Sequence, residues 1–142
     1  MRNTVLVDTG FLIALFDRTD PLHDSAKEFL AEMLSAHDAS LVTVWPTVVE
    51  TCLFLDARGK MALLEWIRRG AMRLRQIEVS DLSKISEIVE KFADQKIDLA
   101  DACVVWLSGV EKTNRVLTTD RRDFQILRTP SGRPFERVWV RP

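Results

Sequence analysis

The segment from residue 99 to residue 110 limits the fold more than any other part of the chain. Its residues are apolar almost all round, so a helix formed there has to be buried on every side. A helix of that kind needs layers of structure around it. With 142 residues and 46% hydrophobic content, the chain can supply those layers within one domain, residues 1–142.

Short apolar runs of strand-forming residues alternate with segments of helical spacing. We expect strands at residues 4–7, 40–44, 74–79, 116–119 and 137–141. We expect helices at residues 11–16, 22–34, 46–55, 61–67, 81–93 and 99–110. This alternation predicts an α/β fold, with a central, mainly parallel sheet of about five short strands and helices on both faces.

Four acidic residues fall where such a sheet would bring them together. Asp8 and Asp120 end strands, whereas Glu50 and Asp101 begin helices. The carboxyl ends of parallel strands and the amino ends of the following helices share one edge, where ligands bind. The sequence therefore predicts that these four side chains meet on one rim of the sheet.

Each acid also has an ordinary structural explanation. Thr47 and Glu50 have the spacing of a capping box. Asp98 is a good helix cap, and Asp101 would then sit at the third helical position, where an acid favours the positive helix end by roughly 0.3–1 kcal/mol. The two acids that follow strands can be simple turn formers. For each acid taken singly, these explanations compete with a shared site.

Taken together, the acids indicate a bound cation. Carboxylates within ~4–6 Å repel one another and destabilise a fold unless protons or cations compensate. An all-oxygen cluster suits Mg²⁺ or Mn²⁺, whereas zinc prefers nitrogen or sulfur, and the two histidines and two cysteines have no metal-like spacing. Because Mg²⁺ commonly completes its shell with phosphate oxygens, we expect phosphoryl transfer or phosphodiester hydrolysis. The chain has no P-loop, no dinucleotide-binding glycine motif and no Gly-x-Ser-x-Gly.

Four segments carry a resemblance to a known family. The chain resembles PIN-domain nucleases, in particular the VapC group of toxin ribonucleases, in four segments: residues 6–9, 48–50, 98–102 and 117–124. These segments follow the order of the family's motifs and extend across almost the whole chain. The resemblance implies a PIN-like fold and metal-dependent endonucleolytic cleavage of RNA. It assigns catalytic roles to Asp8, Glu50, Asp101 and Asp120. It assigns metal binding to Asp8, Asp101 and Asp120, with Glu50 and Asp98 as further candidates.

Two hydroxyl residues are expected to support these acids. Thr118 is the threonine of the family's Thr-x-Asp motif and would hold an acid in place. Thr9 can orient Asp8 or simply shape the turn. Gly10 departs from the family pattern, because relatives often carry a small hydroxyl residue there.

The roles of two further acids and of the basic groups stay open. Asp98 can act on the metal through water or cap its helix. Asp123 can support the site, pair with Arg121 or Arg122, or cap the short helix after the strand. Those two arginines are the candidates for RNA phosphate binding. A second basic group can equally be a solvated helix end: Arg68, Arg69, Arg73 and Arg75. The tryptophans can stack on bases or pack in the core or an interface: Trp45, Trp66, Trp106 and Trp139.

The resemblance also predicts partners. Relatives usually form homodimers and are held inactive by a small antitoxin whose tail enters the acidic groove. The chain shows no long apolar leader or membrane-spanning run, and two separate cysteines fit a reducing compartment, so we expect a cytoplasmic protein. Two alternatives stay open. One is a receiver-like phosphoacceptor signalling domain, which a lone Asp8 and the lack of a lysine at the last strand disfavour. The other is a catalytically silent PIN-fold binding module.

Overall fold

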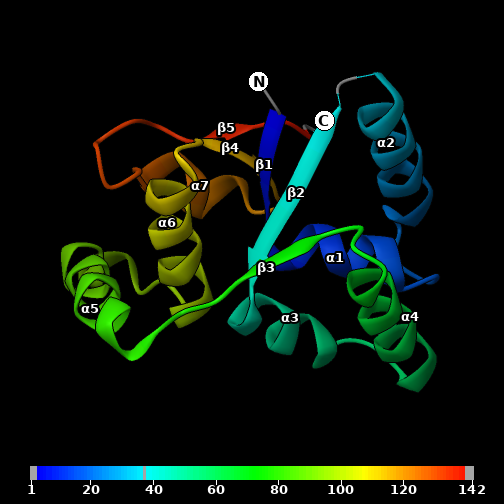
Figure 1. Cartoon of the computed structure of the whole chain (residues 1–142), viewed down its shortest axis with the longest axis horizontal. Coiled ribbons are helices and arrows are strands. Elements are labelled where there is room, and N and C mark those ends of the chain that lie inside the picture. The colour runs from blue at the N-terminus through cyan, green and yellow to red at the C-terminus, as the bar shows by residue number, and fades with distance from the viewer. Residues whose placement is uncertain (1–2, 37, 140–142) are drawn as a thin grey trace.

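The computed structural model describes residues 3–36 and 38–139. In this part of the chain, five parallel strands form one sheet in the order β3-β2-β1-β4-β5 (Figure 1). The strands are β1 (Asn3–Val7), β2 (Ala39–Val44), β3 (Arg73–Arg75), β4 (Arg115–Leu117) and β5 (Glu136–Arg137). The predicted α/β class with a parallel sheet is confirmed.

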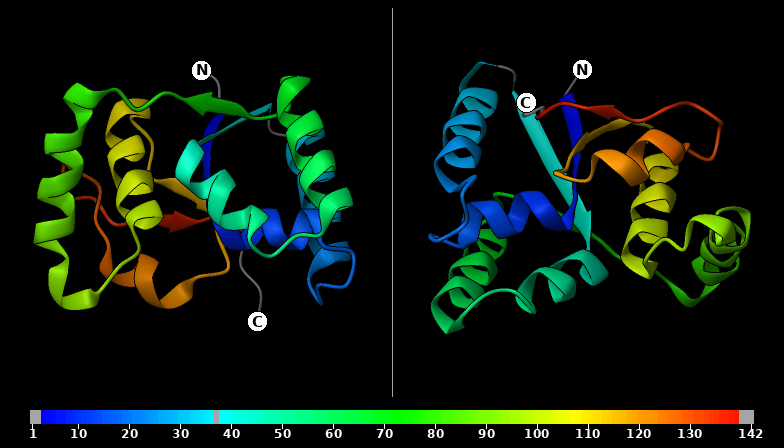
Figure 2. Two further views of the ribbon diagram at one scale, coloured as in Figure 1. Left: turned by 90° about the horizontal axis from the view of Figure 1, so that it is seen from below. Right: turned by 180° about the vertical axis from the view of Figure 1, so that it is seen from behind.

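Helices cover both faces of the sheet, as predicted (Figure 2). One face packs against α1 (Thr9–Phe16), α2 (His23–Ala36) and α4 (Ala57–Arg68), and the other against α5 (Leu82–Lys91), α6 (Leu99–Glu111) and α7 (Arg121–Ile126). Helix α3 (Trp45–Cys52) lies across the carboxyl end of the sheet. Short 3₁₀ turns, η1 (Val79–Asp81) and η2 (Ala93–Gln95), flank α5. None of the described helices is long and apolar enough to cross a membrane.

Strand β1 is central because both of its faces are apolar. Val5 and Val7 face the cluster formed with α1 and α2, whereas Leu6 faces the cluster formed with α6. All three side chains are fully buried, as expected for a parallel strand covered on both sides. Helix α6 is the buried helix predicted from its composition, since every residue from 100 to 108 is buried. It packs on β1, β2, α3 and α5.

Three strand predictions were wrong in extent. The strand expected at residues 116–119 is Arg115–Leu117, so Thr118 and Thr119 follow it. The strand expected at residues 74–79 ends at Arg75, because Glu78 and Asp81 form a reciprocal capping box that starts η1 at Val79. The strand expected at residues 137–141 is only Glu136–Arg137, although Val138 still donates a backbone hydrogen bond to Val116. Residues 140 and 141 lie outside the described part.

The predicted capping box at Thr47 and Glu50 was also wrong. Helix α3 begins at Trp45 directly after β2, with Val44 at the cap position and Pro46 in the first turn. Thr47 is therefore inside the helix, and its buried hydroxyl has no hydrogen-bond partner among residues 3–36 and 38–139. Glu50 is the sixth of the eight residues of α3, so it has no capping role, and the prediction that it begins the helix was wrong.

Candidate active site

The sheet order places a crevice between β1 and β4. From β1 the chain builds the sheet outward through β2 and β3, and then returns to add β4 on the other side of β1. Such a switch point opens a crevice outside the carboxyl ends of the two strands, and ligands bind there in α/β sheets. Asp8 follows β1, its N–H donates to the Leu117 carbonyl at the end of β4 (2.9 Å), and Asp120 comes three residues later.

Asp8 is held by Thr118. The Thr118 hydroxyl donates to Oδ2 of Asp8 (2.8 Å) and accepts the backbone N–H of Asp120 (2.9 Å), so it links the two strand ends. Burial raises the pKa of Asp8 to about 6, with smaller contributions from the charges of Asp120 and Glu50, while the Thr118 hydrogen bond opposes the rise. Asp8 is therefore fixed in position although burial disfavours its ionised form.

Asp101 lies at the centre of the acidic group. Oxygen atoms from the carboxylates of Asp101, Asp120 and Asp123 all lie within 4.8 Å of one another. Burial raises the pKa of Asp101 to about 8, and the nearby charges of Asp8 and Asp120 add to the rise. No hydrogen bond from a described residue offsets this. The carboxylate is thus held among other acids without a protein donor.

Asp123 belongs to this group, which the sequence had left open. The carboxylate of Asp120 caps α7 by accepting the N–H of Asp123 (2.8 Å), and this turn brings the Asp123 side chain back toward Asp101. Asp120, and not Asp123, is therefore the cap of α7. Within the described part of the chain Asp123 forms no ion pair with Arg121, and the charge of Arg122 lowers its pKa only against a larger rise caused by burial.

Glu50 and Asp98 stand together beside this group. Partial burial raises the pKa of Glu50, and the charge of Asp98 adds to the rise. Asp98 occupies the cap position of α6 but makes no side-chain cap hydrogen bond. Both acids line a groove of about 500 Å³ that Trp45 and Leu99 also line. The rim thus holds all four predicted acids, with Asp98 and Asp123 as close neighbours.

The two small residues after Asp8 are tightly packed. Thr9 is 7% exposed, and its hydroxyl has no hydrogen-bond partner in the described structure. Thr9 therefore acts on Asp8 through its backbone N–H, which lowers the pKa of that carboxyl, and not through its hydroxyl. At Gly10 an added Cβ would lie 1.9 Å from the Thr119 hydroxyl oxygen. The glycine that departs from the family pattern is therefore matched to the side chain of Thr119.

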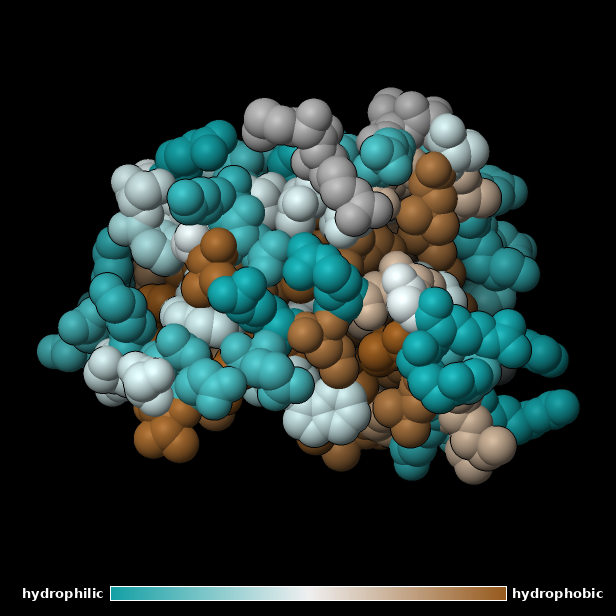
Figure 3. All heavy atoms as spheres, viewed as in Figure 1, coloured by the Kyte–Doolittle hydropathy of each residue, from teal (hydrophilic) through white to brown (hydrophobic). Residues whose placement is uncertain are grey.

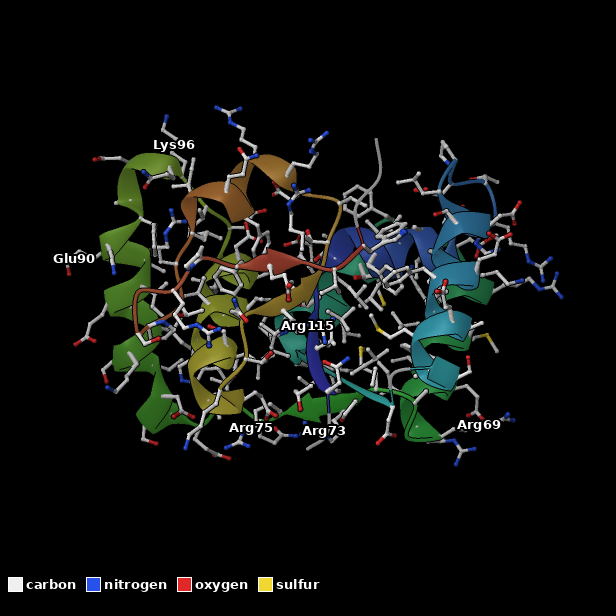
Figure 4. The ribbon with its side chains drawn as sticks, turned by 90° about the horizontal axis from the view of Figure 1, so that it is seen from above. Arg69, Arg73, Arg75, Glu90, Lys96 and Arg115 are labelled. Carbon is white, nitrogen blue, oxygen red and sulfur yellow. The ribbon has the colours of Figure 1, made fainter. Side chains whose placement is uncertain are left out.

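The two groups of basic residues differ in position and in ion pairing. Arg121 and Arg122 are exposed at the start of α7, beside the acids. The second basic group is engaged in ion pairs, with Arg68 and Arg69 on Glu65, and Arg73 and Arg75 on Glu111. Viewed from above, Arg73 and Arg75 lie along β3, on the opposite side of the molecule from α7 (Figure 4). The structural explanation of that group is therefore the better one.

The tryptophans are mostly packing residues. Trp106 and Trp139 are buried, and Trp66 stacks edge-on against Phe16 at a centroid distance of 5.3 Å. Trp45 is 53% exposed. It belongs to an exposed apolar surface that also includes Val49, Leu53 and Leu99, and apolar side chains are visible around α3 in Figure 3.

The donors of the rim suit a hard divalent cation. They are carboxylate oxygens from several elements, crowded enough to raise one another's pKa values, and no described residue donates a hydrogen bond to the buried Asp101. A divalent cation would replace the protons that such a group otherwise retains. Neither cysteine is among these donors, so the chemistry of the set favours magnesium-like ions over zinc.

Fold and rim define a class of protein: a single α/β domain whose parallel sheet carries a carboxylate cluster at its switch point. Residues 5–129 match the PIN domain family, and the chain belongs to that family. It is 33% identical over 136 residues to Ribonuclease VapC26 of Mycobacterium tuberculosis, covering 92% of this chain and 97% of the relative. The family assignment confirms the resemblance seen in the sequence and excludes the receiver-like alternative.

A solved structure shows the same fold. The crystal structure of Mycobacterium tuberculosis VapC20, described as a sarcin–ricin loop cleaving toxin, superimposes with a TM-score of 0.70 at 19% sequence identity. The match covers 83% of this chain and 91% of that chain. The fold is thus shared at a level where sequence identity is low.

Proposed function

We propose that this protein is a divalent-cation-dependent endoribonuclease and the toxin of a toxin–antitoxin pair. The supporting observation is the carboxylate group of Asp101, Asp120 and Asp123, joined to Asp8 through Thr118, in a chain related to Ribonuclease VapC26. Membership in a nuclease family with all expected acids on one rim favours an active enzyme over a silent binding module.

Each acid has a physical role in this proposal. Asp8, Asp101 and Asp120 would hold Mg²⁺ or Mn²⁺, and Asp123 is close enough to join them. The cation supplies Lewis acidity toward a phosphate oxygen and toward water. Glu50 stands beside the group with a raised pKa, which suits it to accept a proton from water at neutral pH.

Positive charge beside the rim would retain the RNA. Arg121 and Arg122 extend from the start of α7 and can bind phosphates flanking the cleaved one. We further propose a homodimer in the cytoplasm, inhibited by an antitoxin. A basic side chain of such a partner would satisfy the acids through charge-assisted hydrogen bonds in place of the cation.

Cleavage of a mixed RNA panel tests the proposal. Purified protein should cut RNA with Mn²⁺ or Mg²⁺ and stop in EDTA, and Asp8→Asn and Asp101→Asn should each remove cleavage. Asp56→Asn is the matched control, because Asp56 caps α4 by accepting the Gly59 N–H away from the rim, and asparagine caps equally well. Cleavage that survives both EDTA and the two rim substitutions would refute the mechanism.

A further inference from the structure

Thr9 carries a buried hydroxyl that the fold does not use. Its residue is 93% buried, and its Oγ1 has no hydrogen-bond partner among the described residues. A buried hydroxyl without a hydrogen-bond partner destabilises the folded state. The Thr9 hydroxyl would therefore be stabilised by a ligand that accepts a hydrogen bond from it.

The amino end of α1 is open at the same place. Thr9 is the first residue of this eight-residue helix, so the first-turn N–H groups have no intrahelical acceptors. Asp8 occupies the cap position but makes no cap hydrogen bond, because its Oδ2 accepts the hydroxyl of Thr118 instead. The Asp8 carboxylate interacts with the N–H of Thr9, but it makes no cap hydrogen bond further into the helix, so the N–H groups of Gly10 and Phe11 stay available among the described residues.

The Thr9 hydroxyl faces the acidic rim. It lowers the pKa of Glu50, so that carboxylate lies within its reach, yet the two form no hydrogen bond of ordinary geometry. On the other side Thr9 adjoins Asp8, whose carboxylate is already held by Thr118. The acids of the rim can only accept hydrogen bonds when ionised. The hydroxyl and the N–H groups of α1 are donors at this position, between Asp8 and Glu50.

We propose that Thr9 and the amino end of α1 bind a non-bridging oxygen of the phosphodiester that is cleaved. This inference rests on the proposed nuclease function. A phosphodiester exposes two non-bridging oxygens, and carboxylates alone would repel both of them. A cation held by the acids would bind one of these oxygens. The hydroxyl of Thr9 and the N–H groups of α1 would donate hydrogen bonds to the other. A helix amino end with a free hydroxyl is a suitable phosphate cradle.

Two substitutions at residue 9 and one matched control test the role of the hydroxyl. Thr9→Val keeps the shape of the side chain and should lower kcat about 10²-fold, because a donor to a developing negative charge is lost. Thr9→Ser should restore kcat to within several-fold of wild type. Thr47→Val removes a second hydroxyl that is buried and has no partner in the described part of the chain, on a residue that is 0% exposed, and it should leave kcat unchanged. Neither valine variant should lower Tm, since each removes an unsatisfied polar group.

Sulfur substitution in the RNA locates the contact. Each phosphorothioate diastereomer replaces one non-bridging oxygen at the cleaved linkage. One diastereomer should be slow with Mg²⁺ and recover with Mn²⁺, which marks the cation-facing oxygen. The other should be slow with both ions in wild type, and Thr9→Val should lose that discrimination.

Three results would overturn the inference. The first is cleavage by Thr9→Val at the wild-type rate. The second is a loss of rate accompanied by a lower Tm, which would show a structural hydroxyl. The third is a loss of rate with thio discrimination unchanged, which would show that Thr9 serves the cation. An inactive wild-type protein would instead refute the proposed function, and this inference with it.

Discussion

Replacing Asp101 by asparagine should stabilise the cation-free protein at neutral pH, although it removes a buried charged residue. The pKa of Asp101 is about 8 in the folded protein against 3.8 in a model peptide. The folded state therefore binds more protons than the unfolded chain between these two values, so stability falls as pH rises from about 4 to about 8. This is the reverse of the usual behaviour of an aspartate in an ion pair.

The size of the effect follows from the pKa difference. Each unit corresponds to 1.36 kcal/mol, and about three units separate the unfolded pKa from pH 7, which gives roughly 4 kcal/mol as an upper bound. Solvent screening reduces this, so we expect Asp101→Asn to raise the free energy of unfolding by roughly 2 kcal/mol at pH 7. At about pH 4 the aspartate is protonated in the folded state, and the difference should vanish.

Urea unfolding in EDTA at both pH values measures the effect. Asp56→Asn, the substitution at the cap of α4, should change little at either pH. Adding Mn²⁺ at pH 7 should then stabilise wild type, by about 2.7 kcal/mol at a concentration one hundred times Kd, and should stabilise Asp101→Asn much less. If Asp101→Asn instead destabilises the protein equally at both pH values, Asp101 is a structural residue and the cation-site argument is wrong.

Three further substitutions test other parts of the structure. Thr118→Val removes the hydroxyl that donates to Asp8, so thermal unfolding should show a loss of about 1–2 kcal/mol, and cleavage should also fall. Gly10→Ala should lower Tm because its Cβ meets the Thr119 hydroxyl, and the double variant with Thr119→Ala should recover most of that loss. Glu111→Gln breaks two ion pairs to arginines of β3, so it should reduce stability by about 1 kcal/mol without changing the cleavage rate.

The position of the rim could be predicted because it depends on topology. Strand and helix periodicity implied parallel strands, and parallel strands put residues that follow β1 and β4 at a common edge. Asp8 and Asp120 needed no side-chain geometry to be placed there. The buried helix α6 could be predicted from its composition, because its residues are apolar almost all round. It carries Asp101 in its first turn.

The features that were missed depend on competition between local hydrogen bonds. Whether a capping box forms at Thr47 depends on where α3 begins, and Pro46 allows an earlier start, since proline suits the first helical turn. Asp123 enters the acidic group only because Asp120 caps α7. The spacing of these two acids, i and i+3 at a helix start, was a signal for that cap. Periodicity carries no information about which of several acceptors a given donor chooses.

The choice of local hydrogen bonds also explains how several acids can lie close together on this rim. Four described helices start there. Asp120 caps α7, whereas α1, α3 and α6 have no side-chain cap hydrogen bond. The amino ends of α1 and α6 present partial positive charge to Asp8 and Asp101, which offsets part of the repulsion among the carboxylates, whereas Glu50 lies beyond the first turn of α3. Had Asp8 and Asp98 capped their own helices, the same ends would be closed to other anions. Holding the acids by Thr118 and by burial keeps helix donors available, so one rim can accept a cation on its carboxylates and a phosphate oxygen on α1.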